Sequence, residues 1–346
     1  MSAHNIGLTI DGRPVKASLG TTVLEAALEA GIYIPNLCYH PDLEPYGGCR
    51  MCIVEIQGVR GFPTACTTKV VEGMEVRTYG EELNQVRSDT LQLLLANHPL
   101  DCLACVKNQR CELQKVAAYL GVTQRTMRRT AHEQAMDDSN PFFKLDRNYC
   151  ILCARCTRTC NEITCVNAIE MVSRGDDMRV SLFGDQKFME SICRSCGECV
   201  VRCPVGALVP KNDVIPATEV LTTCCYCAVG CSMYLGVRDG KIVSVRGNRE
   251  GKSNNGKLCV KGRFGISEFV QHPDRLASPL IRGENGLAPA GWDEALALVA
   301  SRLKSYAPDE IAVIASARCS NEEVYVTQKL ARAVLGTNNI DHCARL

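Results

Sequence analysis

The sequence predicts an α+β protein made of several small domains, and three observations lead to this fold class. The chain has 346 residues, 46% hydrophobic and 22% charged, which is enough for two or three ordinary globular domains. Strand-like and helical patterns alternate along it. It also contains 23 cysteines, nearly all of them between Cys38 and Cys259, which indicates small domains organised around bound groups.

Charge and hydropathy exclude several classes of protein. Lysine and arginine total 39 against 38 aspartates and glutamates, so a formal charge of +1 favours neither nucleic acid nor an anionic membrane as partner. No apolar run approaches the roughly 18 to 20 residues that span a bilayer, and the N-terminus lacks the regions of a signal peptide. We therefore expect a cytoplasmic protein. An odd cysteine count in so long a chain favours metal binding over disulfides.

The N-terminal region predicts a hairpin followed by a helix. Residues 6–17 alternate apolar and polar side chains about the pair Asp11-Gly12, which is typical of a two-residue hairpin turn. Thr22 and Glu25 have the spacing of a capping box, and Gly31 stands where a C-terminal cap is expected.

Further elements complete a small α+β domain of about 80 residues. Strand-like patterns cover residues 51–58 and 74–78, and an apolar helix is expected over 82–97. Residues 121–148 are polar, arginine-rich and without a sustained period, so they predict a connector, although a basic docking surface is an alternative.

The C-terminal part predicts a break, a hairpin and an α/β layer. Residues 209–218 carry two prolines and predict a break, and residues 234–246 predict a hairpin that turns at Asp239-Gly240. Beyond Trp292 the pattern becomes helix, apolar strand and helix, which is the opening of an α/β layer.

The first cysteine group has the spacing C-x10-C-x2-C-x13-C. It consists of Cys38, Cys49, Cys52 and Cys66. A close pair on a loop can hold one iron while two distant thiolates complete a [2Fe-2S] centre. Zinc is the alternative, and the iron-sulfur patterns downstream argue against it.

The second group has the spacing H-x3-C-x2-C-x5-C and consists of His98, Cys102, Cys105 and Cys111. Three cysteines without a fourth indicate that His98 completes a [4Fe-4S] site, and an imidazole in place of a thiolate raises the potential of a cluster. A histidine that merely packs near a helix end is the alternative.

The third and fourth groups repeat the run C-x2-C-x2-C-x3-C, which is typical of paired [4Fe-4S] clusters. In such runs the fourth cysteine binds the other cluster. The expected ligand sets are therefore Cys150, Cys153, Cys156 with Cys203, and Cys193, Cys196, Cys199 with Cys160.

The fifth group has the spacing C-x2-C-x3-C-x27-C and predicts a fourth [4Fe-4S] site. It consists of Cys224, Cys227, Cys231 and Cys259, Cys225 being excluded by spacing. Lys261 follows the last ligand, either as a solvated residue or as a bridge between cluster and cofactor. The remaining thiols, Cys165, Cys225, Cys319 and Cys343, are expected to be free and buried as small apolar groups.

Taken in this order, the five groups resemble the large subunit of a soluble, complex-forming formate dehydrogenase that uses molybdenum or tungsten. Residues 1–210 are similar to the relay domain shared with the peripheral-arm large subunit of respiratory complex I and with iron-only hydrogenases. Residues 219–346 are similar to the start of the molybdopterin-dinucleotide oxidoreductase body through TCCYCAVGC, KLCVKGRFG, HPDRLASPLIR, GWDEAL and AVLGTNNIDHCARL.

The resemblance implies five domains and one connector in order. They are a β-grasp-like [2Fe-2S] domain (1–80), a [4Fe-4S] domain with one histidine and three cysteine ligands (81–120), a connector (121–148), a two-cluster ferredoxin domain (149–210), a [4Fe-4S] domain of the Mo/W-bis-pterin type (217–273) and the start of the α/β molybdopterin oxidoreductase domain (274–346). By the same resemblance Lys261 lies between a cluster and the pterin, and Arg318 approaches the cofactor.

The resemblance also places the catalytic residue outside this chain. In the family, the segment matching IDHCARL precedes a catalytic selenocysteine or cysteine and then a histidine, so the residue is expected immediately after Leu346. We hypothesise that a selenocysteine codon was read as a stop; a deliberately shortened chain or a naturally short subunit is the alternative. The 346-residue chain is then expected to be inactive towards formate.

The implied function is electron relay within a formate dehydrogenase or CO2 reductase. Electrons pass between a Mo- or W-bis-molybdopterin guanine dinucleotide site and a partner subunit through one [2Fe-2S] and four [4Fe-4S] clusters. Expected partners are flavin and NAD(P)-linked, ferredoxin-linked or hydrogenase subunits. The alternatives are a complete non-catalytic electron-transfer subunit and a relay subunit of the complex I or hydrogenase type.

Overall fold

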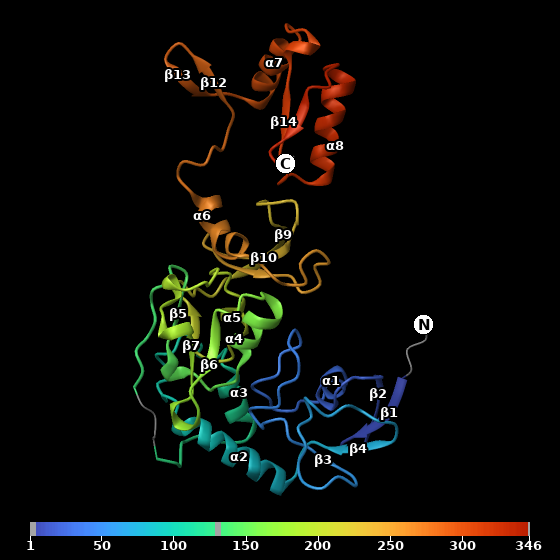
Figure 1. Cartoon of the computed structure of the whole chain (residues 1–346), viewed down its shortest axis with the longest axis vertical. Coiled ribbons are helices and arrows are strands. Elements are labelled where there is room, and N and C mark those ends of the chain that lie inside the picture. Colours follow the sequence, from blue (N-terminus) through green and yellow to red (C-terminus); the bar gives the residue numbers. More distant parts are fainter. Residues whose placement is uncertain (1–4, 129–132, 345–346) are drawn as a thin grey trace. The chain divides into compact units, whose positions relative to one another are not determined.

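The computed structural model describes residues 5–128 and 133–344, and the chain divides into two units, Met1–Asp213 and Val214–Leu346. Figure 1 traces the order of the helices and strands through both units. The two units are described separately. Within the described residues, no helix combines the length and the apolar character needed to cross a bilayer.

The first unit begins with a four-stranded sheet of order β2-β1-β4-β3. Its strands are β1 (Asn5–Ile10), β2 (Arg13–Ser18), β3 (Glu55–Ile56) and β4 (Met74–Arg77). Strand β1 pairs with β2 antiparallel and with β4 parallel, and α1 (Val23–Glu29) buries its apolar face in the core of this module.

Local sequence signals account for most of this module. Asp11 and Gly12 both adopt positive φ (50° and 75°), as the predicted two-residue hairpin turn requires. The Thr22 side chain accepts from the Glu25 N–H and completes the predicted capping box. The strand expected over residues 51–58 is wrong in extent: only Glu55–Ile56 is a strand, because the chain around Cys52 turns to form the metal loop.

Two helices and the cysteine-rich segments share one apolar core. Helix α2 (Glu81–Ala96) confirms the predicted helix, and α3 (Glu112–Tyr119) was not predicted. Their buried leucines pack with Cys38 and Met51 of the N-terminal module and with Ile151, Cys153 and Val205 further along the chain. Three of the predicted cluster groups therefore meet in a single core.

The segment with the repeated cysteine run contains short elements in a near-symmetric order. They are β5 (Phe143–Leu145), α4 (Arg155–Arg158), a π-helical turn (Thr159–Ile163), β6 (Ile169–Val172), β7 (Arg179–Leu182), α5 (Glu198–Arg202) and β8 (Leu208–Pro210). Strand β5 pairs with β8 and β6 with β7, both antiparallel. The predicted connector is thus partly ordered, because β5 at its end closes the module against β8.

The second unit starts with a three-stranded antiparallel sheet of order β11-β10-β9. Its strands are β9 (Thr218–Thr223), β10 (Ser232–Arg238) and β11 (Lys241–Gly247). The predicted hairpin is confirmed, with Asp239 and Gly240 at positive φ in the turn. A π-helical turn (Lys261–Gly265) and α6 (Ile266–Gln271) follow.

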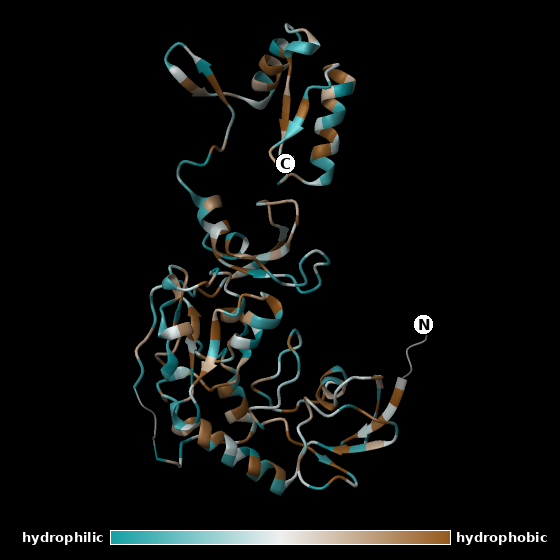
Figure 2. Cartoon of the chain, in the orientation of Figure 1, coloured by the Kyte–Doolittle hydropathy of each residue, from teal (hydrophilic) through white to brown (hydrophobic). Residues whose placement is uncertain are grey.

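The rest of this unit confirms the predicted α/β opening. It contains the hairpin β12 (Leu280–Gly283) and β13 (Gly286–Pro289), then α7 (Trp292–Leu303), β14 (Val313–Ala315), α8 (Asn321–Lys329), a π-helical turn (Leu330–Val334) and β15 (Ile340–His342). Strands β14 and β15 pair in parallel across α8. Apolar residues mark β14 and recur along α7 and α8 (Figure 2).

Candidate metal centres

The first cysteine group forms a set of sulfurs in mutual contact. Cys38, Cys52 and Cys66 are buried and Cys49 is half-buried, although they lie on separate turns of the N-terminal module. The Cys38 thiol hydrogen-bonds with those of Cys49 and Cys66, and Cys66 also contacts Cys52. The structure thus brings together all four residues expected to hold the [2Fe-2S] cluster.

These contacts redistribute protons among the four sulfurs. Hydrogen bonds from Cys49 and Cys66 hold the pKa of Cys38 far below its ordinary value, and the contact with Cys66 lowers the pKa of Cys52. The same hydrogen bonds raise the pKa of Cys49 and of Cys66. The group shares fewer protons than it has sulfurs, which suits a site that binds iron through thiolates.

His98 presents one ring nitrogen that has no partner in the protein. The side chain is 6% exposed, its Nδ1 lies 2.6 Å from the Pro99 carbonyl oxygen, and its buried Nε2 has no hydrogen-bond partner. Burial lowers the pKa of His98, so the imidazole is neutral. With the proton on Nδ1 donated to Pro99, the Nε2 lone pair is free for a metal, the arrangement that ligand histidines adopt.

The three cysteines of this group lie in turns between α2 and α3. Cys102 and Cys105 are close enough to Cys111 to raise its pKa, after the larger effect of burial. A Cβ on Gly206 would lie 2.7 Å from the Cys105 sulfur and 3.5 Å from the Tyr149 ring, so this position requires glycine. The Tyr149 ring in turn stacks edge-on against His98, at 5.7 Å between centroids.

Two cavities separate the repeated cysteines into the predicted sets. One cavity is lined by Cys160, Cys193, Cys196 and Cys199, together with Phe143 and Phe188. The other is lined by Cys150, Cys153, Cys156 and Cys203. The last cysteine of each run thus faces the cavity of the other run, as the spacing predicted.

The backbone around the two cavities repeats as the sequence does. The N–H groups of Leu152 and Ser195 each donate to a sulfur two residues earlier, that of Cys150 and that of Cys193, both at 3.4 Å. Each loop turns through positive φ at two positions, Leu152 and Ala154 in one, Ser195 and Gly197 in the other. These turns aim three sulfurs at one cavity and supply N–H donors that stabilise thiolates.

The deepest sulfurs need positive charge beside them to ionise. Burial raises the pKa of Cys156 and of Cys199 well above the ordinary thiol value. They become thiolates when a metal compensates the charge. Within residues 5–128 and 133–344, no three His, Cys, Asp or Glu side chains converge as ligands of a single ion; a cubane does not require this, because each cysteine binds a different iron.

The fifth group lies in the second unit, between β9 and the turn that begins at Lys261. Cys224 is buried, Cys231 half-buried, and Cys227 and Cys259 exposed. The charges of Cys224, Cys227 and Cys259 each raise the pKa of Cys231, after the larger effect of burial, so the four sulfurs are neighbours. Lys261 is exposed two residues after Cys259, at the start of the π-helical turn.

The C-terminal expectations are only partly within the described residues. Arg318 is exposed in the bend after β14, where its N–H donates to the Ser316 hydroxyl at 3.1 Å. Arg345 and Leu346, which end the IDHCARL segment, lie outside the described residues.

The prediction that the four remaining thiols are buried is wrong for three of them. Cys165, Cys225 and Cys343 are exposed, and Cys319 is half-buried. Each exposed thiol lies in a turn or loop beside a regular element, and Cys165 has a positive φ of 52° that directs it out of the helical turn before it.

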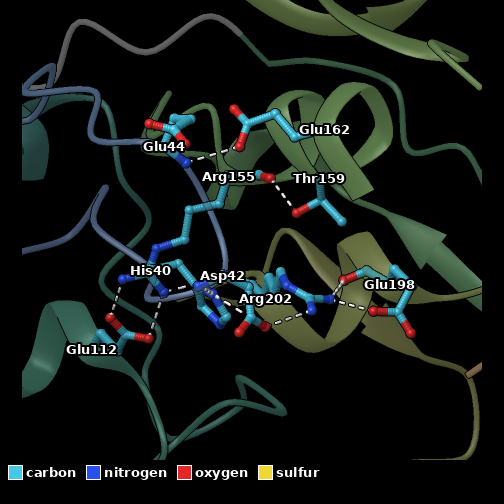
Figure 3. A network of polar contacts seen from close by, with 9 residues as sticks. All are labelled: His40, Asp42, Glu44, Glu112, Arg155, Thr159, Glu162, Glu198 and Arg202. Atoms are coloured by element: carbon cyan, nitrogen blue, oxygen red, sulfur yellow. Dashed lines mark hydrogen bonds and ion pairs between the residues drawn. The ribbon is translucent and has the colours of Figure 1, made fainter. Parts of the chain in front are cut away.

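Sequence reasoning missed a set of arginines around the cysteine groups. Figure 3 shows the polar network between the N-terminal module and the repeated-cysteine module. Arg155 forms a bidentate pair with Glu112 at 2.6 and 2.7 Å, and Arg202 binds both Asp42, at 2.7 Å, and Glu198. Both arginine side chains are 4% exposed, so these pairs fix the modules in a desolvated contact.

Arg158 and Arg87 hold backbone carbonyls beside the first cysteine group. Arg158, on α4, donates to the carbonyls of Cys38 and Glu44. Arg87, on α2, is fully buried and donates to the carbonyl of Ile53, the residue after Cys52. No local pattern could have revealed them, because the Arg158 contact with Cys38 spans 120 residues.

Comparisons with protein families match five successive segments of the chain. Residues 3–81 match the 2Fe-2S iron-sulfur cluster binding domain, and 87–126 the NADH-ubiquinone oxidoreductase-G iron-sulfur binding region. Residues 140–209 match the ferredoxin-like domain of NADH-quinone oxidoreductase subunit 3. Residues 217–271 match the molybdopterin oxidoreductase Fe4S4 domain, and 275–346 molybdopterin oxidoreductase.

Curated relatives match almost all of the chain. It is 37% identical over 350 residues to the NADPH-Fe(3+) oxidoreductase subunit alpha of Geobacter sulfurreducens, covering 99% of this chain and 40% of the relative. It is 39% identical over 348 residues to the G 2 subunit of the NADH-quinone oxidoreductase of Rhizobium meliloti, covering 98% and 40%. A Staphylococcus aureus protein provisionally named formate dehydrogenase is 30% identical, covering 100% and 39%. The chain thus spans about two fifths of the length of these relatives.

A solved structure is similar in fold and sequence. A chain of an NAD+-reducing [NiFe]-hydrogenase in the H2-reduced state is 33% identical, with a TM-score of 0.56. The match covers 60% of this chain and 87% of the hydrogenase chain.

Proposed function

This chain belongs to the iron-sulfur oxidoreductases of the molybdopterin oxidoreductase family, and from that membership we propose that it relays electrons between a molybdopterin site and a partner subunit. The observation that carries the proposal is the pair of cavities, each lined by four cysteines in the exchanged arrangement of a two-cluster ferredoxin. The clusters supply one-electron transfer when bound; the chain supplies ligands, burial and hydrogen bonds to sulfur.

We assign one [2Fe-2S] and four [4Fe-4S] clusters to the five groups. The β-grasp-like N-terminal module would hold the first through four sulfurs already in contact. The free Nε2 of His98 would complete the second. The two cavities would hold the third and fourth, and the sulfurs around Cys224 the fifth.

We further propose that the full-length protein oxidises formate or reduces CO2 at a molybdenum- or tungsten-bis-pterin site. The support is the DHCARL segment, which resembles the one that precedes the catalytic selenocysteine or cysteine in formate dehydrogenases. The proposal places that residue after Leu346. Lys261, exposed beside the fifth group, would face the pterin, and Arg318 would approach it.

A second candidate is a relay subunit of an NAD(P)H-linked oxidoreductase. It is favoured by the 37–39% identity to the NADPH-Fe(3+) oxidoreductase and NADH-quinone oxidoreductase subunits, against 30% for the protein named formate dehydrogenase. Both candidates share the relay and differ in the molybdopterin site and the partner.

Iron and sulfide analysis with electron paramagnetic resonance (EPR) on the anaerobically purified chain tests the relay. We expect about 18 irons per chain and both cluster types; zinc in their place would refute the assignment. Viologen reduction by the full-length complex from its native host then separates the candidates. Formate-dependent reduction supports the first, and reduction by NADPH or NADH without formate turnover supports the second. The 346-residue chain alone should not reduce viologen with formate.

A further inference from the structure

The loop between the first two cysteines of the [2Fe-2S] group, residues 38–48, is held by side chains of the neighbouring repeated-cysteine module. The Glu44 N–H donates to the Glu162 carboxylate at 2.9 Å, and the Glu44 carbonyl accepts from Arg158 at 2.6 Å. Asp42 pairs with Arg202 at 2.7 Å. Figure 3 shows the Glu44–Glu162 and Asp42–Arg202 contacts. The loop is therefore positioned from outside its own module.

Arg158 makes the contact nearest to the predicted cluster. One guanidinium nitrogen donates to the carbonyl of Cys38 and another to that of Glu44, while the Tyr46 ring lies against the guanidinium, 5.1 Å from its carbon to the ring centroid. Its Nε is buried without a partner. A planar fork that grips two carbonyls and stacks on a ring is a role that lysine cannot fill.

The charge of Arg158 acts on the sulfur as well as on the backbone. Its positive charge contributes to the lowered pKa of Cys38, although the hydrogen bonds from Cys49 and Cys66 contribute more. Reduction adds one negative charge to a cluster, and a nearby fixed cation stabilises the reduced form more than the oxidised form.

We propose that Arg158 is a positioning residue of the [2Fe-2S] site, which fixes the Cys38 loop and raises the reduction potential of a cluster in the adjacent module. The inference rests on the proposed function, because it assumes that this group holds a [2Fe-2S] cluster. It also links two sites: Arg158 lies on α4 between Cys156 and Cys160, which face different cavities.

A redox titration of the full 346-residue holoprotein tests the proposal. The [2Fe-2S] signal is followed by EPR at temperatures where [4Fe-4S] signals have broadened away. We expect Arg158→Gln to lower the reduced-to-oxidised ratio at a fixed potential about tenfold, which for one electron is about 59 mV. Arg158→Lys, which retains the charge, should stay within about threefold of the wild type.

Arg179→Gln is the matched control, because Arg179 is in the same module and pairs with Asp185 at 2.6 Å. It should leave the [2Fe-2S] potential unchanged. An unchanged potential in Arg158→Gln overturns the proposal, as does an equal shift in Arg179→Gln. If Arg158→Gln loses the cluster, Arg158→Lys decides: a wild-type-like potential supports the proposal and a tenfold shift overturns it. A wild type without a [2Fe-2S] signal would instead overturn the proposed function.

Discussion

Replacing Arg87 by methionine should detach the N-terminal module from helix α2. The Arg87 side chain is fully buried, and it donates to the carbonyls of Thr78, at 2.8 Å, and Ile53, and to the Asn84 side chain. Thr78 and Ile53 are themselves 3% and 2% exposed, so water cannot replace the lost donors. Methionine fills similar volume and supplies none of these hydrogen bonds.

The magnitude follows from the two buried carbonyls. A hydrogen bond to a charged group contributes about 1.5–3 kcal/mol, so losing two costs about 3–6 kcal/mol. Removing a buried charge returns part of this cost, because its desolvation is unfavourable; burial accordingly lowers the pKa of Arg87. We expect a net loss of about 3 kcal/mol in the unfolding free energy of the module, the lower end of the range.

Urea unfolding followed by the visible circular dichroism of the [2Fe-2S] chromophore measures this loss. At an m-value of about 1.5 kcal/mol/M the midpoint should fall by about 2 M. Arg77→Met is the control, because Arg77 is 65% exposed and makes only a surface pair with Glu55 at 3.2 Å, worth about 0–1 kcal/mol. Equal midpoints for the two variants would refute the argument from buried carbonyls.

Three further predictions concern the other cysteine groups. His98→Ala should lose up to about four irons per chain, whereas His98→Cys should retain them at a lower EPR midpoint potential; full iron in the alanine variant would exclude His98 as ligand. Cys160→Ser and Cys203→Ser should each remove a different [4Fe-4S] signal, so loss of the same signal in both would contradict the exchanged sets. Because burial lowers the pKa of His98, the unfolded chain takes up a proton below about pH 6.5 that the folded chain does not. The urea midpoint should therefore be full above about pH 6.5 and fall below it, less so in His98→Cys; equal slopes would contradict this.

Local signals in the sequence predicted the elements that depend on neighbouring residues. The Asp11-Gly12 and Asp239-Gly240 turns and the Thr22 capping box form where predicted, because each is stabilised within a few residues. Helix α3 was missed for the opposite reason. Its N-cap is Cys111, which makes no side-chain cap, and the Glu112 N–H donates instead to the carbonyl of Pro204, far along the chain.

The cysteine sets could be predicted because spacing encodes which sulfurs reach one cavity. The turns that do this repeat in sequence and in backbone, from Leu152 to Ser195. The arginines around the sets could not be predicted, because their partners are carbonyls and carboxylates far along the chain, as for Arg158 with Glu44, 114 residues away. Exposed thiols such as Cys165 were also missed, since burial depends on the turn that precedes them.

The exchange of Cys160 and Cys203 between the two cavities sets a lower limit on what can be transplanted. A graft of the first run alone would carry three of the four cysteines that line one cavity and a single cysteine of the other, and a graft of the second run would do the reverse. The segment from Cys150 to Cys203 is therefore inherited or engineered as one piece, and a duplication that created the repeat became useful when both copies stood in the same chain.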